Sequence, residues 1–502
     1  MPTNKVSPIS PIKASSVDHW DYETDVAVIG CGGAGACAAI SAHDVGARVM
    51  VFELASGIGG STALSSAEVY LGGGTRVQKA TGHKDTKRAM ADFLIAAAGP
   101  QADTAKIVAY VAGSTDHFDW LVAQGVVFKD SEYPHRAIMA LTDDCLLYTG
   151  GENAYPYNIQ AMPAPRGHNL QVAGDNGGPL LMKILGTKIE EKSIPVELNS
   201  RALTLIVDDS GDQQLVIGVK VRIDMQERYV KACSGVILAS GGFVMNEEMV
   251  KKYAPELTKC TVPIGNPGDT GSGILMGMGV GGAAINMHEG FVSLPFYPPA
   301  SLTYGVFINS QGKRFVNEDS YHGRVGAYIL RQTGGSVYLV LAVEDYGAYE
   351  TESYLNADVV ATADSIAELE SDLNLPEGQL QVTISDYNQY AEVGKDELFH
   401  KDPAWLKPMR PPFVALDVTP GQGAFFPYFT LGGLDTLPTG EVLKTSGDVI
   451  KGLYAVGRTA CGIPRRGEGY ASGMSVGDAT FTGRQAGIAA GTRSTTQGNT
   501  NG

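Results

Sequence analysis

The sequence predicts an α/β protein, and three observations near its N-terminus carry that prediction. Residues 25–30 form a short run rich in Val, which is typical of a buried parallel strand. An Ala-rich stretch follows and stops at Gly46, as helices often do, and a second apolar run covers residues 47–53. Strand, helix and strand in this order make one β-α-β unit, from which Rossmann-like sheets are built.

Three glycines occupy the turn between the first strand and the helix. Gly30, Gly32 and Gly35 match the spacing G-x-G-x-x-G. In this motif the first glycine permits a tight turn, the second lets a pyrophosphate approach the backbone, and the third lets the helix pack against the strand. The helix N-terminus offers free N–H groups to the phosphates. Glu53 ends the second strand, where an acid binds the ribose hydroxyls, so we predict a dinucleotide site for either FAD or NAD.

Composition restricts the class of protein. A chain of 502 residues suggests two or three domains, and a charged share of 18% predicts a sizeable core. The net charge of −16 argues against nucleic acid or an anionic membrane as partner. No apolar run is long enough for a transmembrane helix.

The N-terminus and the cysteines indicate the compartment. Residues 1–20 lack the apolar region of a signal peptide, and we expect them to form a loose arm. The six cysteines are scattered and contain no C-x-x-C pair. This pattern is typical of reduced thiols, so we predict a cytoplasmic protein, and we predict no metal site.

Several segments downstream carry a family resemblance. Gly60, Ser61 and Thr62 belong to a G-G-S-T turn after the second strand. This turn is similar to one that contacts the FAD phosphates in the succinate dehydrogenase/fumarate reductase flavoprotein superfamily. The resemblance continues in the family's order through residues 118–128, 234–243, 308–318, 430–434, 452–458 and 472–487. It implies FAD as the cofactor, with Met474 and Ser475, at the start of the last predicted helix, as further contacts.

Two departures from the family pattern concern the cofactor. Members that hold FAD covalently carry a His in the loop after the G-G turn, and residues 59–75 contain none. We therefore expect FAD to be bound without a covalent bond. Arg458 stands where the family often has a Glu that contacts a cofactor hydroxyl, so it is a candidate cofactor contact. Asp269 and Ser272 lie where the family has residues near the cofactor, and a direct contact is left open.

The resemblance also implies the domain organisation. From about residue 289 the sequence becomes aromatic and Pro-rich, and a helical, acidic stretch follows. This segment corresponds to the inserted α+β catalytic or capping domain of the family. We therefore expect a Rossmann-like FAD-binding domain over 1–289 and 428–502, with the catalytic domain at 290–427.

The family's dicarboxylate ligands are replaced here. Tyr470 falls at the position of a dicarboxylate-binding Arg, and Pro464 and Phe429 stand where the family has His. A buried carboxylate without a counter-charge is costly, whereas a neutral ketone needs only one or two hydrogen-bond donors. We expect a flat, apolar ketone as substrate. Arg465 and Arg466 are the alternative, because they could bind a carboxylate.

The residues at these positions resemble those of the 3-ketosteroid dehydrogenases. That group carries a Tyr in a Y-A-G/S-G turn, as at Tyr470, and another Tyr after R-F-x-N-E, as at Tyr321. Ser472 stands where the Δ1 branch usually has Gly, which favours the branch that forms a 4,5 double bond in 5α-3-ketosteroids. The resemblance implies a hydroxyl relay of Tyr321, Tyr470 and Ser472 that removes a proton beside the ketone. His322 is a weaker candidate at the position of Tyr321.

Alternative functions stay open on the sequence. They are a Δ1-dehydrogenase, a fumarate-reductase-like enoate reductase, and a flavin-binding interaction protein without turnover. Four aromatic residues could line a steroid slot or pack in the core: Phe291, Phe296, Tyr297 and Tyr304. The electron acceptor is not indicated.

Overall fold

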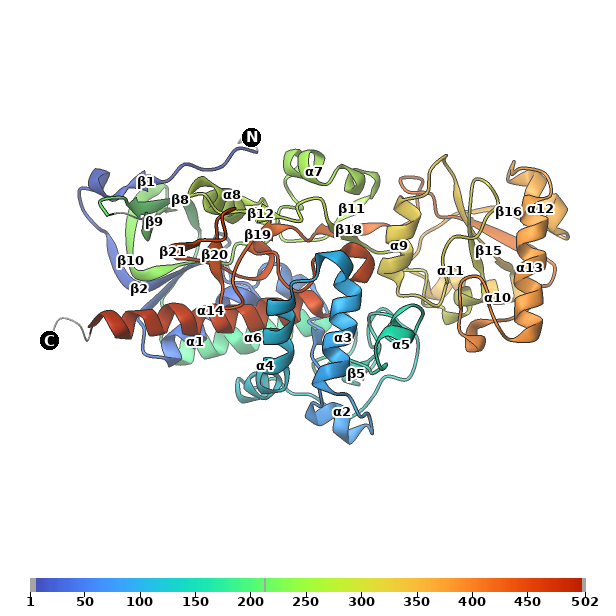
Figure 1. Cartoon of the computed structure of the whole chain (residues 1–502), viewed down its shortest axis with the longest axis horizontal. Helices are drawn as coiled ribbons and strands as arrows, with labels where there is room; N and C mark the ends of the chain where they lie inside the picture. The colour runs from blue at the N-terminus through green and yellow to red at the C-terminus, as the bar shows by residue number, and fades with distance from the viewer. Residues whose placement is uncertain (1–5, 212–213, 499–502) are drawn as a thin grey trace.

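One large sheet dominates the computed structural model, which describes residues 6–211 and 214–498 (Figure 1). Its strand order is β1-β8-β9-β21-β10-β2-β3-β7, with β20 beside β21. The bounds are β1 Ile12–Lys13, β2 Tyr22–Ile29, β3 Val49–Phe52, β7 Val196–Glu197, β8 Ser200–Asp208, β9 Leu215–Ile223, β10 Gln226–Leu238, β20 Glu441–Leu443 and β21 Val449–Ala455.

The predicted β-α-β unit lies towards the β7 edge of this sheet. Strands β2 and β3 are parallel, in a register that runs from Val26 opposite Val49 to Ile29 opposite Phe52. Helix α1, Gly33–Asp44, connects them. On the other side of β2, β10 and then β21 continue the parallel arrangement. The prediction of an α/β nucleotide-binding fold is therefore confirmed.

Small residues let two long helices pack closely against each other. Helix α14, Met474–Gly498, runs along α1 beside the sheet (Figure 1). A Cβ atom at Gly483 would lie 2.2 Å from the carbonyl oxygen of Ala34, and one at Gly487 would lie 2.3 Å from that of Ala38. The Ala- and Gly-rich composition of both segments therefore serves helix packing. Helix α6, Gly177–Glu191, lies against α1 as well.

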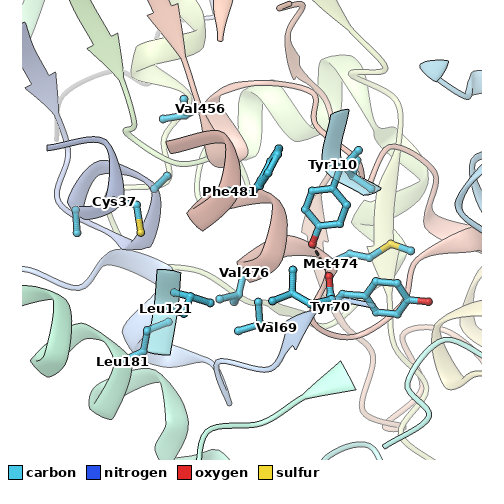
Figure 2. Packing of buried hydrophobic residues seen from close by; sticks show 14 of the residues in the cluster. Cys37, Val69, Tyr70, Tyr110, Leu121, Leu181, Val456, Met474, Val476 and Phe481 are labelled. Carbon is cyan, nitrogen blue, oxygen red and sulfur yellow. Dashed lines mark hydrogen bonds between the residues drawn. The ribbon is translucent and has the colours of Figure 1, made fainter. Parts of the chain in front are cut away.

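A helical layer and a small sheet support the start of α14. The small sheet has the order β4-β6-β5. Figure 2 shows Tyr70 of β4, Tyr110 of α4 and Met474 of α14 in one apolar cluster, where the Tyr110 hydroxyl donates to the Tyr70 carbonyl oxygen. The bounds are β4 Val69–Tyr70, β5 Leu146–Leu147, β6 Gly167–His168, α2 Arg76–Ala80, α3 Lys87–Ala98, α4 Thr104–Ala123 and α5 Tyr157–Gln160.

A second, four-stranded antiparallel sheet lies at the far end of the molecule from β1 (Figure 1). Its strand order is β14-β15-β17-β16, and it shares a separate apolar core with α12 and α13. The bounds are β14 Val306–Asn309, β15 Val337–Ala342, β16 Val359–Ala363, β17 Phe413–Asp417, α9 His322–Leu330, α10 Val343–Tyr346, α11 Tyr349–Glu352, α12 Ile366–Asp372 and α13 Gln379–Val393.

Two paired strands connect this second sheet to the first. Strand β13, Gly290–Val292, is antiparallel to β18, Pro427–Thr430, and places Phe291 opposite Phe429. The predicted domain boundaries at 289/290 and 427/428 fall on these strands. Strand β11, Val262–Pro263, pairs in parallel with β18. The bounds of the other elements are α7 Glu247–Tyr253, α8 Ser272–Gly279, β12 Ala284–Ile285 and β19 Gly433–Leu434.

The N-terminal segment differs from the prediction of a loose arm. Residues 12–13 form β1, which pairs in parallel with β8 at the edge of the large sheet. The Ile9 N–H also donates to the Leu275 carbonyl oxygen at 2.9 Å. Val6 and Ile9 pack against the core, and this apolar contact explains why the segment is held despite its prolines. Residues 1–5 lie outside the described part of the chain.

Within the described residues, no helix combines the length and the apolar character needed to cross a membrane. All six cysteines are free thiols. Cys31 lies in the nucleotide-binding turn, but burial and the nearby Glu53 carboxylate raise its pKa to about 12. Its thiol is therefore not a reactive nucleophile at neutral pH.

Candidate active site

A cavity of ≈ 720 Å³ extends from the nucleotide-binding turn to the strands that connect the two sheets. We call the two ends of this cavity the cofactor end and the aromatic end. The cofactor end comprises Gly30, Gly32, Glu53, Ser61 and Thr62. The aromatic end comprises Phe291, Phe429, Tyr470 and Ser472.

Each of the three motif positions is glycine for a different structural reason. Gly30 has a φ of +99°, and a Cβ there would lie 2.5 Å from the Ala239 carbonyl oxygen. A Cβ at Gly35 would lie 2.0 Å from the Gly30 carbonyl oxygen, so the helix can approach the strand only without a side chain. At Gly32 the nearest protein atom would be 3.5 Å away, and the residue lines the cavity. The fold therefore requires Gly30 and Gly35, whereas Gly32 leaves room for a ligand.

The G-S-T turn is fixed against the start of α1. Oγ1 of Thr62 accepts a hydrogen bond from the Gly33 N–H at 3.1 Å. The Ser61 hydroxyl donates to Oδ2 of Asp269 at 2.5 Å and accepts from the Asn266 N–H at 2.8 Å. Asp269 and Ser272 both line the cavity. These contacts place Gly60 and its neighbours beside Gly32 and leave the N-terminus of α1 facing the cavity.

Glu53 is held by backbone groups on both oxygens. Oε2 accepts from the Cys31 N–H at 2.6 Å, and Oε1 accepts from the Ala55 N–H at 2.8 Å. Each carboxylate oxygen can accept a further hydrogen bond. The carboxylate is therefore oriented towards the cavity and can still accept from two ribose hydroxyls, as the sequence predicts.

Arg458 is a buried cation with an unused donor. Its Nη2 donates to the Ser475 hydroxyl oxygen at 2.7 Å, and its guanidinium lies 4.3 Å from the centre of the Phe429 ring. Nη1 has no hydrogen-bond partner among the described residues, and burial lowers the pKa of the group. Such an orphaned donor on the cavity wall suits an acceptor atom of a flavin ring or its ribityl chain.

The three predicted catalytic residues lie close together, but they form two pairs and no single relay. The Tyr321 and Ser472 hydroxyl oxygens are 2.6 Å apart. The Tyr470 hydroxyl is 2.7 Å from that of Ser475 and not bonded to Ser472. Tyr470 follows a tight turn at Gly467–Gly469, and Tyr321 immediately precedes α9. Sequence spacing could not show that the Tyr470 side chain turns towards α14, where Ser475 is its partner.

Both tyrosines act as neutral hydroxyls. Burial raises the pKa of Tyr321 well above its ordinary value. Burial also raises the pKa of Tyr470, although the nearby Arg458 opposes the shift. Ser472 and Tyr470 line the cavity, whereas Tyr321 stands behind Ser472 and is not among the described lining residues.

Two phenylalanine rings pack against the Tyr470 ring. The Phe291 ring centre is 4.4 Å from that of Tyr470 and 4.8 Å from that of Phe429. Phe429 and Tyr470 meet edge to face at 5.4 Å. Of the four aromatic candidates for a steroid slot, Phe291 lines the cavity. Among the residues that the structure describes, Phe296, Tyr297 and Tyr304 are not part of the cavity wall.

The two arginines that could have held a carboxylate are occupied elsewhere. Arg465 donates to the carbonyl oxygens of Gln101, Cys461 and Gly462 at 3.1–3.2 Å. Arg466 donates to Glu468 at 2.6 Å. Neither side chain is part of the described cavity wall. The structure therefore removes the sequence argument for a dicarboxylate clamp at these positions.

His322 lies on the cavity wall as an uncharged side chain. Its Nδ1 is 2.7 Å from the Ser293 hydroxyl. Burial lowers its pKa to about 3, and the positive charge of Arg136 acts in the same direction. Neutral at physiological pH, it contributes no charge to the site.

Two further residues differ from what the sequence suggested. Met474, a predicted cofactor contact, points into the apolar cluster of Figure 2, and its N–H donates to the Ala471 carbonyl oxygen at 3.1 Å. Glu68 was not singled out, yet it lines the cavity with only 2% of its surface exposed. An acid between Ala67 and Val69 in an otherwise apolar segment was the available signal.

The cofactor end and the hydroxyl pairs define a flavin-dependent oxidoreductase, and comparison with known families agrees. Residues 25–469 match the FAD binding domain family, and the chain belongs to that family. FAD is its cofactor. Among the described residues, no group of three or more His, Cys, Asp or Glu side chains could hold a metal ion.

A solved structure and several curated proteins are similar to the whole chain. The 3-ketosteroid-Δ4-(5α)-dehydrogenase from Rhodococcus jostii RHA1, solved with 4-androstene-3,17-dione, is 40% identical with a TM-score of 0.91. The match covers 96% of this chain and 100% of that one. A fumarate reductase (cytochrome) of Shewanella frigidimarina is 29% identical over 92% of this chain and 76% of its own length. A 3-oxosteroid 1-dehydrogenase of Mycolicibacterium smegmatis is 28% identical over 87% and 92%, respectively.

Proposed function

We propose that this protein is an FAD-dependent 3-ketosteroid dehydrogenase that forms the double bond between carbons 4 and 5 of a 5α-3-ketosteroid. The observation that carries the proposal is the pair of hydroxyl couples in an aromatic wall, Tyr470–Ser475 and Tyr321–Ser472. The similar Rhodococcus jostii enzyme supports the choice of substrate class. No electron acceptor is assigned.

The Tyr470–Ser475 couple, which we call the donor pair, holds the ketone oxygen. Arg458 has only donors, so the Ser475 oxygen accepts from it, and in the proposed arrangement the Ser475 hydroxyl donates to the Tyr470 oxygen. The Tyr470 hydrogen is then free to point into the cavity. Because this chain ends in a buried cation, it stabilises negative charge that develops on the ketone oxygen and so acidifies carbon 4.

The Tyr321–Ser472 couple, which we call the acceptor pair, takes the proton from carbon 4. Ser472 faces the cavity, and its backbone is fixed on both sides. Its N–H donates to the Thr149 carbonyl oxygen at 3.0 Å, and its carbonyl oxygen accepts from the Thr149 hydroxyl at 3.1 Å. Bound FAD would accept the hydride from carbon 5. Positioned proton transfer of this kind is worth about 10²–10⁴-fold in rate.

Desaturation between carbons 1 and 2 is the second candidate, since it uses the same ketone activation. Ser472 favours the 4,5 position, because the resemblance places Gly there in the Δ1 branch. Reduction of a dicarboxylate is less well supported, because Arg465 and Arg466 are bonded elsewhere. We further propose that residues 290–427 form the catalytic domain and that the protein works in the cytoplasm.

We also propose that FAD is held without a covalent bond. Residues 59–75 contain no His, and the cavity histidine His322 has its Nδ1 beside the Ser293 hydroxyl. Acid precipitation of the protein should release all of the yellow colour into the supernatant. Colour that remains in the pellet contradicts this.

An anaerobic titration tests the proposed reaction. A 5α-3-ketosteroid should bleach the oxidised flavin, and NMR should locate the new double bond of the product at carbons 4 and 5. A double bond at carbons 1 and 2 would favour the second candidate. Re-oxidation of the reduced flavin by an enoate, without bleaching by the steroid, would assign a reductase. No response to either compound would indicate a flavin-binding protein without turnover.

A further inference from the structure

Glu68 is a buried carboxyl on the cavity wall for which the mechanism above has no role. It immediately precedes β4, and 2% of its surface is exposed. Neither carboxylate oxygen has a hydrogen-bond partner among the described residues. An unpartnered ionisable group at this depth destabilises a fold, so its presence needs a reason other than packing.

The carboxyl lies beside the acceptor pair. The Tyr70 N–H, two residues along, donates to the Gly473 carbonyl oxygen at 3.1 Å, which holds this segment against the turn that carries Ser472. A Cβ atom at Gly167 would lie 2.5 Å from Oε1 of Glu68 and 2.6 Å from Cγ2 of Thr149. The Glu68 carboxyl and the Thr149 side chain therefore both border the backbone at Gly167. Thr149 is also the residue that forms hydrogen bonds with both the N–H and the carbonyl oxygen of Ser472.

Burial brings the pKa of the Glu68 carboxyl close to neutral pH. Burial raises its pKa to about 8; the Glu152 carboxylate acts in the same direction, and the Thr149 hydroxyl opposes it. Arg166, a buried cation immediately before strand β6, is paired with Asp85 at 2.8 Å. The negative charge of Glu68 in turn contributes to raising the pKa of Tyr321 and of Tyr470.

We propose that Glu68 is the proton acceptor behind the acceptor pair, an inference that rests on the proposed function. The proton leaves carbon 4 for the Ser472–Tyr321 hydroxyls, and one hydroxyl proton of the pair passes to the ionised Glu68 carboxylate. The electrons of the broken bond at carbon 4 form the new double bond as the hydrogen at carbon 5 leaves with its own electron pair, which bound FAD would accept. Both hydroxyls are neutral again at the end, and the carboxyl holds the proton.

This step explains how two neutral hydroxyls can act as a base. A tyrosine whose pKa is raised by burial cannot remain ionised and wait for substrate. A hydroxyl pair can pass a proton only if a stronger base accepts it on the far side. Glu68 is a carboxylate on this wall whose oxygens are not engaged by backbone groups, in contrast to Glu53 at the cofactor end.

The pH dependence of single-turnover flavin reduction by a 5α-3-ketosteroid tests the inference. Only the ionised carboxylate can accept a proton, so the rate should rise tenfold per pH unit below about pH 8 and level off above it. We call the rising part of this pH–rate profile the limb. In Glu68→Gln the limb should disappear, and the rate above pH 8 should fall by about 10²-fold or more. FAD content measured beside each rate confirms that the variant is folded and loaded.

A neighbouring carboxyl provides the matched variant. Glu152→Gln removes a negative charge near Glu68 and should lower the pKa of Glu68, so the limb should move to lower pH while the plateau is retained. If Glu68 had only a structural role, the Glu152→Gln substitution would not shift the limb. A limb that stays in place in Glu152→Gln, or that persists in Glu68→Gln, overturns the proposal.

Infrared difference spectroscopy of the holoenzyme without substrate gives a readout independent of turnover. The band of a protonated carboxyl should be lost with a midpoint near pH 8 in the wild type and be absent in Glu68→Gln. The same band in both proteins overturns the inference. If the band titrates as expected but no ketosteroid reduces the flavin, the proposed function fails, and the proton-accepting role fails with it.

Discussion

At the cofactor end of the cavity, the shape of the site comes mainly from one continuous stretch, residues 30–62, with Asp269 supporting the turn at Ser61. At the aromatic end, side chains from separate segments meet: Phe291, Phe429, Tyr470 and Ser472, with Glu68 also on the cavity wall and Tyr321 behind Ser472. The first arrangement can bind the same dinucleotide in many enzymes. The second can exchange a dicarboxylate clamp for hydroxyl pairs without disturbing the nucleotide fold. Substrate class and cofactor are therefore set by separate parts of this molecule.

The largest effect is expected from a change at the cofactor end. Gly32→Val should abolish FAD binding, because its side chain would occupy the space beside the pyrophosphate. The flavin absorbance of the purified protein measures this. Gly57→Val is the matched control, since Gly57 is exposed and a Cβ there would meet nothing within 4 Å. A yellow Gly32→Val protein would show that the dinucleotide lies elsewhere.

A change at the aromatic end should spare the cofactor and remove the reaction. Tyr470→Phe deletes the hydroxyl that holds the ketone oxygen, and we expect about 10²–10³-fold slower flavin reduction with full FAD content. Stopped-flow absorbance measures the rate. Tyr338→Phe on β15, which is not part of the described cavity wall, should react as the wild type does. Equal rates in both variants would remove Tyr470 from the site.

A smaller decrease in the rate of flavin reduction is expected from a change at Ser475, the hydrogen-bond partner of Tyr470. Ser475→Ala leaves the tyrosine in place but breaks the chain from Arg458 that orients its hydrogen. One lost hydrogen bond of about 1 kcal/mol corresponds to an approximately fivefold decrease in rate. If FAD is lost instead, Ser475 serves the cofactor directly. A loss as large as that of Tyr470→Phe would mean that the donor pair works only as a unit.

No effect at all is expected from dicarboxylates. Succinate and fumarate at millimolar concentration should neither change the flavin spectrum nor be turned over, because Arg465 and Arg466 are occupied by backbone carbonyls and Glu468. Difference spectroscopy of the oxidised protein checks this. A saturable spectral change would restore a carboxylate site at the aromatic end.

The same contrast explains what the sequence could predict. Gly30, Gly35 and Glu53 act through nearby backbone, so their spacing alone indicates their geometry. The partner of Tyr470 depends on a side-chain direction set by packing between distant segments, and a three-residue relay was predicted where two pairs exist. Glu68 was missed because an isolated acid carries no spacing pattern. The strand at Ile12–Lys13 is short and depends on its pairing with β8, which no local pattern reveals.

In the proposed mechanism, Tyr321 and Ser472 act as one acceptor pair. Single-turnover flavin reduction by a 5α-3-ketosteroid in Tyr321→Phe, Ser472→Ala and the double variant tests it most directly. Each single change should slow the reaction by roughly 10²-fold, and the double variant should be no slower than the slower single variant, because residues that act as a unit fail together. Losses that multiply in the double variant, or a Ser472→Ala enzyme at near wild-type rate, would contradict the claim.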